Sequence, residues 1–133
     1  MSLTEKNIRE KEFHNKLHLR KKKRFENVFY KAISNLFDDF YDYLKNHIKN
    51  KDILDFGCGI GSITEKVISY EPRNILGIDI SDQSISIAKK RSRELNLNIQ
   101  YQVQNCEKTT LTSNSFDIIY GSGILHHLDL EKS

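Results

Sequence analysis

The sequence predicts an α/β protein in which a parallel sheet of about four strands follows an N-terminal helical segment. From residue 51 onward, short apolar runs alternate with segments of helical periodicity. The first of these runs ends in a glycine-rich turn that opens a helix, whereas residues 1–50 show helical periodicity alone. Because parallel strands are joined by right-handed crossovers that usually contain a helix, this order of elements predicts one parallel sheet.

The predicted elements follow one another without repeats and without a linker rich in Pro, Gly or Ser. We expect a polar helix over residues 4–18 and an amphipathic helix with an aromatic face over residues 24–48. The strands are expected at residues 53–56, 74–79, 99–103 and 116–120. Helices follow the first two strands, one over residues 61–70 and one from the N-cap Ser81 to about Leu95. We therefore divide the chain into a helical cap segment, residues 1–50, and a sheet domain, residues 51–133.

The composition excludes several classes of protein. With 133 residues, of which 38% are hydrophobic and 29% charged, the chain suits one globular domain. It has no apolar run of the length that a membrane span needs, and its first residues lack the apolar region of a secretory signal. Cys58 and Cys106 do not show metal-ligand spacing, so we expect no metal site and a reduced, cytoplasmic protein.

The positive charge is concentrated near the N-terminus. Residues 1–50 contain twelve Lys and Arg against seven Asp and Glu, whereas residues 51–133 contain nine against eleven. The densest cluster, residues 16–24, suits either a solvated helix face or a contact with nucleic-acid phosphates. We favour the solvated face, because charge runs are usually solvated, and expect no nucleic-acid partner.

The stretch ILDFGCGIGS places glycines at positions 57, 59 and 61, directly after the first strand. Such a turn lets a ligand approach the backbone, and the helix that it opens presents unpaired N–H groups. Dinucleotide-binding turns have their third glycine where this chain has Ser62, which disfavours a nicotinamide-dependent oxidoreductase. Asp79, at the end of the second strand, is suited to accept both ribose hydroxyls. A helix-capping role is the alternative, although Ser81 already supplies a cap.

Four motifs together resemble one family. Besides the glycine turn and "ILGIDIS", which contains Asp79, they are "NCE" at residues 105–107 and "FDIIYGSGILHHLD" at residues 116–129. In this order and spacing, residues 53–129 resemble the first half of the class I S-adenosylmethionine-dependent methyltransferases, the group called methyltransferase type 11. The resemblance implies a three-layer Rossmann-like fold and S-adenosyl-L-methionine as the cofactor. It also implies a domain truncated after strand four, because the family's sheet continues beyond the point where this sequence stops.

The resemblance assigns roles to the residues that follow the first two strands. The turn would face the methionine part of the cofactor, through Gly57, Cys58, Gly59 and Gly61. Asp55 would organise the loop and reach the amino end of the methionine. Asp79 would hold the ribose hydroxyls, and Ile80 would cover one face of the adenine.

The resemblance places the adenine and sulfonium contacts after the next two strands. Asn105 stands where the family has Asp, and its side-chain carbonyl would accept from the adenine amino group without a charge, which predicts weaker binding. Cys106 would reach a ring nitrogen through its backbone N–H. Gly121 and Ser122 would lie near the sulfonium. His126 is a candidate general base near pH 7. Alternatively, His126 caps or packs the following helix. No general base is then needed, because a sulfonium methyl reacts readily once it is well positioned.

The methyl acceptor is implied by a motif that this chain lacks. Where the branch that methylates amino groups of DNA and some proteins carries Asn/Asp-Pro-Pro-aromatic, residues 121–124 read GSGI, so the resemblance implies a small-molecule acceptor. His14, Phe29 and Tyr30 of the cap segment are candidates for contacting cofactor or acceptor. A non-catalytic cofactor-binding subunit and a fragment of an RNA methyltransferase are the alternatives. The fourth strand would present an unpaired edge, which favours self-association or a partner chain.

Overall fold

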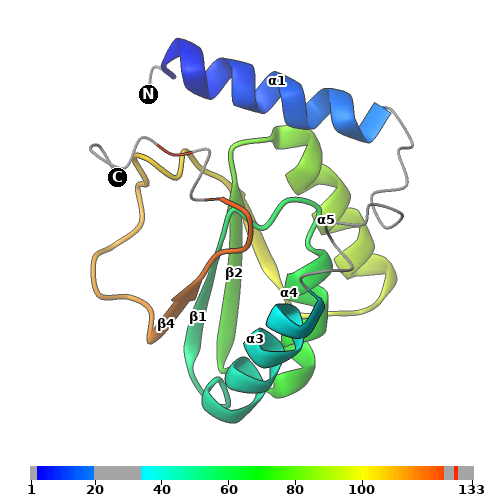
Figure 1. Ribbon diagram of the computed structural model, residues 1–133, viewed down its shortest axis with the longest axis vertical. Helices are drawn as coiled ribbons and strands as arrows, with labels where there is room; N and C mark the ends of the chain where they lie inside the picture. Colours follow the sequence, from blue (N-terminus) through cyan, green and yellow to red (C-terminus); the bar gives the residue numbers. More distant parts are fainter. Residues whose placement is uncertain (1–2, 20–33, 125–127, 129–133) are drawn as a thin grey trace.

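The computed structural model describes residues 3–19, 34–124 and 128, and Figure 1 shows how their elements are arranged. In chain order they are α1 (Glu5–Leu19), α3 (Ser34–His47), β1 (Asp52–Phe56), α4 (Ser62–Val67), the 3-10 helix η2 (Ile68–Tyr70), β2 (Asn74–Asp79), α5 (Asp82–Glu94), β3 (Gln100–Val103) and β4 (Ile118–Tyr120). The alternation of strands and helices that the sequence predicts is confirmed. Among the described residues, no helix is long and apolar enough to cross a membrane.

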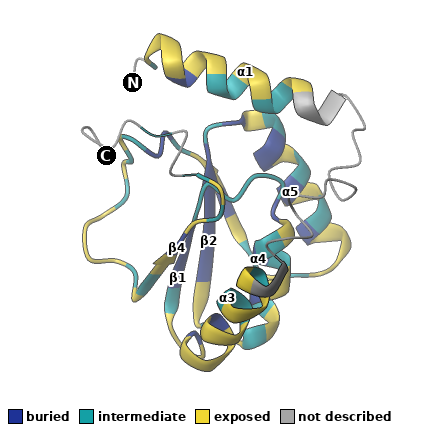
Figure 2. Ribbon diagram, in the orientation of Figure 1, coloured by how far each residue is buried: buried dark blue, intermediate teal, exposed yellow. Residues whose placement is uncertain are grey.

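The four strands form one parallel sheet in the order β3-β2-β1-β4, which confirms the predicted architecture. Asp55 of β1 lies in register with Gly77 of β2 on one side and with Tyr120 of β4 on the other. Most residues of the two central strands are buried, as Figure 2 shows. Strand β4 lies at one end of the described sheet, and its Ile119 side chain is 61% exposed. The predicted edge is therefore present in the described part of the chain.

Helices α3, α4 and α5 cover one face of the sheet (Figure 1). The core on this face contains Leu44, Ile48, Ile53, Val67, Ile75 and Tyr120. On the other face, Leu54 and Ile78 pack with side chains of the irregular segment 104–117 and with Ile124. The third layer that the resemblance implies consists, within the described residues, of this non-helical segment.

Helix α1 lies across the carboxyl ends of the strands, beside α5 (Figure 1). It begins after Thr4, whose hydroxyl accepts a hydrogen bond from the backbone N–H of Asn7, while the Asn7 side chain accepts one from the backbone N–H of Thr4. This reciprocal pair satisfies two N–H groups that a helix start leaves without partners. It explains why a segment of low amphipathicity forms the predicted helix.

The element boundaries differ from prediction by one or two residues, with local causes. The helix expected over residues 61–70 is α4 followed by η2, and the pair ends where Glu71 adopts a positive φ of 61°. Strand β4 begins at Ile118 rather than at residue 116, because the Phe116 side chain packs into the core on the other face. Of the helix expected over residues 24–48, the described part is α3, and residues 24–33 lie outside the described part of the chain.

Candidate functional site

The glycine turn after β1 is tied to β2 by its backbone. The N–H groups of Gly57 and Cys58 both donate to the carbonyl of Ile78, over 2.9 and 2.8 Å. Gly59 has a positive φ of 56°, and a Cβ atom placed on it would meet no heavy atom within 4 Å. At Gly57 and Gly61 a Cβ would instead collide with Ile124 and with Tyr101. The outer glycines are therefore required by packing, and Gly59 alone borders open space that a ligand can fill.

Asp79 holds this turn from the end of β2. Its carboxylate accepts from the Gly59 N–H and from the Ser81 N–H, both over 2.9 Å. Helix α5 begins beside it, and the Ser81 hydroxyl caps that helix by accepting from the Ser84 N–H over 3.1 Å. Because a carboxylate has roughly four acceptor positions, Asp79 keeps capacity for further donors. The cap of α5 is therefore Ser81 and not Asp79, which was the alternative role for this aspartate.

Asp55 lies beneath the turn and faces the helix-covered side of the sheet. Its Oδ2 accepts from the Thr64 hydroxyl over 2.7 Å and from the Tyr120 hydroxyl over 2.9 Å. Burial raises the pKa of Asp55 to about 6, although these two hydrogen bonds lower it and the charge of Asp79 raises it further. Asp55 does not line the hollow described next, and its hydrogen bonds instead join the end of β1 to α4 and β4.

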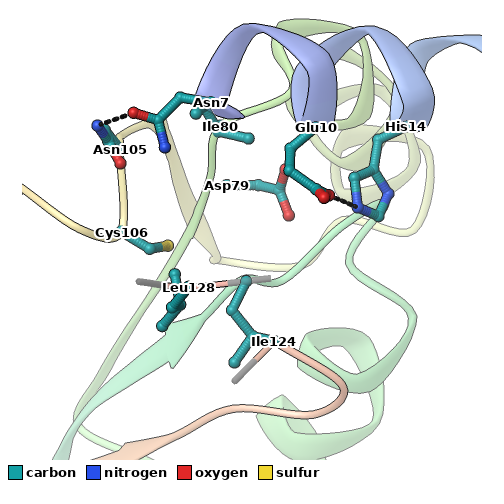
Figure 3. Close-up of a pocket in the computed structure, with 9 residues that line it drawn as sticks. All are labelled: Asn7, Glu10, His14, Asp79, Ile80, Asn105, Cys106, Ile124 and Leu128. Atoms are coloured by element: carbon teal, nitrogen blue, oxygen red, sulfur yellow. Dashed lines mark hydrogen bonds and ion pairs between the residues drawn. The ribbon is translucent and has the colours of Figure 1, made fainter. Parts of the chain in front are cut away.

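A hollow that is open to solvent, with a cavity volume of about 40 Å³, lies between α1 and the carboxyl ends of the strands. Figure 3 shows its lining residues, which are Asn7, Glu10, His14, Asp79, Ile80, Asn105, Cys106, Ile124 and Leu128. The three from α1 follow helical spacing and so share one face. His14 Nε2 lies 3.7 Å from Glu10 Oε2. Its walls combine apolar residues with a few polar groups, as small-molecule sites do.

The loop after β3 supplies Asn105 and Cys106. Asn105 is 8% exposed, and its side-chain oxygen accepts from the Glu107 N–H over 3.0 Å while its nitrogen donates to the Asn7 side-chain oxygen over 3.1 Å. Burial raises the pKa of Cys106 to about 12, so the thiol stays protonated at neutral pH. Burial also raises the pKa of Cys58, and both cysteines are free thiols. Among the described residues, no group of three His, Cys, Asp or Glu is arranged to hold a metal ion.

The structure brings some of the predicted site residues together and separates others. Asp79, Ile80, Asn105, Cys106 and the cap residue His14 line the hollow, whereas Gly59 does not line it but donates a hydrogen bond to Asp79. Gly121 and Ser122 follow β4 but do not line the hollow. His126, Phe29 and Tyr30 lie outside the described residues.

The sequence predicted that the stretch from Glu10 onward, with His14 in it, shapes the pocket, but it did not predict Asn7. Asn7 lines the hollow together with Glu10 and His14. One available signal was the spacing of polar residues 7, 10 and 14, which puts them on one face of a helix. A second was the capping threonine, Thr4, three residues before Asn7. Ile124 and Leu128 form its apolar side and had no such signal.

Residues 53–133 match the model of a family described as "Methyltransferase domain". The chain is 36% identical over 81 residues to a ubiquinone biosynthesis O-methyltransferase of Coxiella burnetii (strain Dugway 5J108-111), covering 61% of this chain and 34% of that protein. It is 33% identical over 76 residues to phosphoethanolamine N-methyltransferase 1 of Arabidopsis thaliana, covering 57% of this chain and 16% of that protein. The chain therefore spans about a third, or less, of the length of these relatives.

Two solved structures share the fold. Magnesium protoporphyrin IX methyltransferase from Synechocystis PCC 6803, with bound S-adenosylmethionine, superposes with a TM-score of 0.76 at 16% identity, covering 98% of this chain and 68% of that one. TehB from Haemophilus influenzae gives a TM-score of 0.63 at 22% identity, covering 71% and 32%. At these identities the likeness is one of fold.

Proposed function

Because the chain belongs to the methyltransferase-domain family, we propose that it binds S-adenosylmethionine in the hollow under α1 and transfers its methyl group to a small molecule. One observation carries the proposal. The Asp79 carboxylate lines the hollow and accepts a hydrogen bond from the backbone N–H of Gly59, a turn glycine with open space beside it. An acid after the second strand and a glycine turn after the first are the groups that a nucleoside-type ligand requires.

The residues of the hollow fit such a cofactor by their chemistry. The remaining acceptor capacity of Asp79 suits the ribose hydroxyls, and the open space at Gly59 suits the methionine part. Ile80 and the protonated Cys106 offer apolar contact to an adenine ring, and Asn105 offers a side-chain carbonyl to its amino group. The cofactor, when bound, supplies an electrophilic methyl on a sulfonium, and these residues contribute binding and orientation, which can supply much of the rate.

The small-molecule acceptor is supported by the relatives and by one short segment. The two relatives carry names of small-molecule pathways, one an O-methyltransferase and one an N-methyltransferase. Residues 121–124 read GSGI, without the Asn/Asp-Pro-Pro-aromatic motif associated with methylation of nucleic-acid bases. His126 is our candidate for the base that removes the acceptor's proton, and Gly121 and Ser122 are our candidates for the path of the acceptor toward the sulfonium.

The edge of β4 is the site where we propose that a further strand adds, from this chain or from a second one. Ile119 is 61% exposed there, and no described strand pairs with the outer side of β4. Unpaired edges template strand addition. An Ile119→Lys substitution is expected to reduce self-association in sedimentation measurements without changing cofactor affinity, and an unchanged sedimentation profile would argue against pairing of two copies.

The first test is calorimetric titration with S-adenosylhomocysteine, with NAD as the comparison ligand. We expect binding of the homocysteine compound alone, weakened about 10- to 100-fold in Asp79→Ala, because hydrogen bonds to a charged acceptor contribute about 1.5–3 kcal/mol. Asp79→Asn, which keeps one carbonyl acceptor, should bind with intermediate affinity. The matched control is Asp38→Ala on the exposed side of α3, which should bind as the unaltered chain does. A folded chain that binds neither ligand would overturn the proposal.

The acceptor class needs a separate measurement. With S-adenosylmethionine supplied, the release of S-adenosylhomocysteine should rise above background when small phenols or amines are present as methyl acceptors. It should stay at background with tRNA or duplex DNA. Release stimulated by nucleic acid alone would favour the alternative of an RNA methyltransferase fragment.

A further inference from the structure

Asn7 is a buried polar side chain on α1 whose hydrogen bonds join the helix start to the loop after β3. It is 5% exposed. Its side-chain oxygen accepts from the Thr4 N–H over 3.2 Å, from the Thr4 hydroxyl over 2.8 Å and from the Asn105 side-chain nitrogen over 3.1 Å. Its side-chain nitrogen donates to Glu107 Oε2 over 2.8 Å. Figure 3 shows the contact with Asn105 at the margin of the hollow.

These bonds fix which way the Asn7 amide faces. A flip of this amide would point its nitrogen at the donors of Thr4 and its oxygen at the carboxylate of Glu107. A donor would then face donors at Thr4, and an acceptor would face an acceptor at Glu107, which is costly for buried groups. Asn7 therefore presents its oxygen, an acceptor, to Asn105.

The orientation of Asn7 in turn fixes that of Asn105. The Asn105 nitrogen must donate to Asn7, and the Asn105 oxygen accepts from the Glu107 N–H. An amide oxygen has a second lone pair, so Asn105 can still accept from a ligand. If Asn105 rotated by half a turn about its last bond, its oxygen would face the Asn7 oxygen, and the Glu107 N–H would face an NH₂ group.

We infer that Asn7 is a positioning residue that holds the carbonyl side of Asn105 toward an amino-bearing base, and so makes α1 part of the selection of adenine. The inference rests on the proposed function and assigns to α1 a share in base selectivity. A carboxylate can only accept, but an amide that is free to turn can either accept or donate. Without Asn7, only the Glu107 N–H still holds the Asn105 oxygen in place. Asn105 can then turn more readily and donate to a ring carbonyl, so a base with an oxo group in place of the amino group becomes a more acceptable ligand.

The test compares two ligands that differ at this one group, S-adenosylhomocysteine and S-inosylhomocysteine, by calorimetric titration of the full chain. The unaltered chain should prefer the adenosyl compound by about tenfold, the value of one hydrogen bond to a buried group. Asn7→Ala should reduce this preference to about threefold or less, whatever it does to the absolute affinities. Asn7→Asp combined with Glu107→Gln keeps an acceptor for Asn105 and for Thr4 and puts an amide, not a second carboxylate, beside residue 7, so this double variant should retain the preference.

Asn15→Ala is the matched control, because Asn15 ties α1 at its other end. Its side chain accepts from the Ser81 hydroxyl and donates to Asp82 Oδ1 over 3.3 Å, without touching Asn105. A purely structural loosening of α1 should weaken both ligands by the same factor and leave their ratio unchanged. The inference is wrong if Asn7→Ala behaves in this way, or if the double variant Asn7→Asp with Glu107→Gln loses the preference as Asn7→Ala does. A folded chain that binds neither compound would instead refute the proposed function, and the inference with it.

Discussion

The Tyr120 hydroxyl of β4 donates a hydrogen bond to Asp55 Oδ2 of β1 over 2.9 Å, directly beneath the glycine turn. Both side chains are buried, and the Thr64 hydroxyl of α4 donates to the same carboxylate oxygen over 2.7 Å. A strand, the helix after the turn and the strand at the end of the described sheet thus meet at one carboxyl group. The stability of the turn should therefore depend on this group and on its charge.

Tyr120→Phe should lower the free energy of unfolding by about 1.5–3 kcal/mol, because it removes a buried hydrogen bond to a carboxylate and leaves that acceptor without one of its donors. Urea denaturation followed by circular dichroism measures the change. Tyr43→Phe is the control, since the Tyr43 ring is exposed on α3, and it should change the free energy by no more than about 0.5 kcal/mol. Equal effects of the two substitutions would contradict this account of Tyr120.

The titration of Asp55 should make the free energy of unfolding depend on pH. Its pKa rises from the ordinary value of 3.8 to about 6 in the folded chain, chiefly through burial, so the folded state binds the proton more tightly than the unfolded state. Its contribution to stability is therefore fully present below about pH 4 and is lost as the pH rises through about 6. At 1.36 kcal/mol per pKa unit, the loss amounts to about 3 kcal/mol at most.

Asp55→Asn tests this sign, because an amide oxygen can still accept from Thr64 and Tyr120 but does not titrate. The free energy of unfolding of the unaltered chain should fall between pH 4 and pH 7 relative to that of the variant. The comparison is made by urea denaturation at a series of pH values. A difference that stays constant over this window, or one that grows in the opposite direction, would contradict the raised pKa.

The sheet could be predicted from sequence because its signals are local. The runs around Ile53 and Ile75 are short, apolar and followed by turn or capping residues, which is sufficient to predict parallel strands joined by helices. The alternation of side chains along a strand also predicts which face of the sheet Asp55 points to, because Asp55 shares a face with Ile53 and not with Leu54. That face is the one covered by helices, which explains why Asp55 supports the turn without lining the hollow.

The contacts that close the hollow could not be predicted in the same way. Asn7 and Asn105 are 98 positions apart in sequence, and no local pattern pairs them. Gly77 is a similar case, because its place in β2 is explained only by the Tyr101 ring and the Cys58 sulfur, which a Cβ atom would meet at 2.7 and 2.9 Å. Such requirements arise from packing between elements, and they become visible only when the elements are placed in space.

The two glycines that follow Cys58 should respond differently to alanine. Gly61→Ala places a Cβ against the Tyr101 ring and within 3.2 Å of Ala88, at a φ of 82°, so overpacking and backbone strain add. It should lower the free energy of unfolding by about 2 kcal/mol or more. Gly59→Ala meets no atom within 4 Å and should cost only the strain of its positive φ, about 1 kcal/mol.

The order of the two variants should be reversed for cofactor affinity, with the larger loss in Gly59→Ala. At a temperature where both are folded, Gly59→Ala should weaken binding of S-adenosylhomocysteine more than Gly61→Ala does, because its methyl group occupies the space kept for the ligand. Thermal denaturation and calorimetric titration of the same samples measure the two quantities. If Gly59→Ala binds as the unaltered chain does, the methionine part of the cofactor does not lie against Gly59.

Asn105→Asp restores the residue typical of the family, yet in this chain it should weaken cofactor binding. The new carboxylate would face the Asn7 oxygen, which already accepts from Thr4, and Asn7 cannot turn without facing Glu107 with its oxygen. Two acceptors in contact at a buried place cost about 1–3 kcal/mol, or about 5- to 150-fold in affinity for S-adenosylhomocysteine. In an Asn7→Ala background the opposing oxygen is absent, so the same substitution should be neutral or should improve binding. Calorimetric titration of the four chains measures this difference, and an Asn105→Asp substitution that improves binding equally in both backgrounds would show that Asn7 does not control the side chain at position 105.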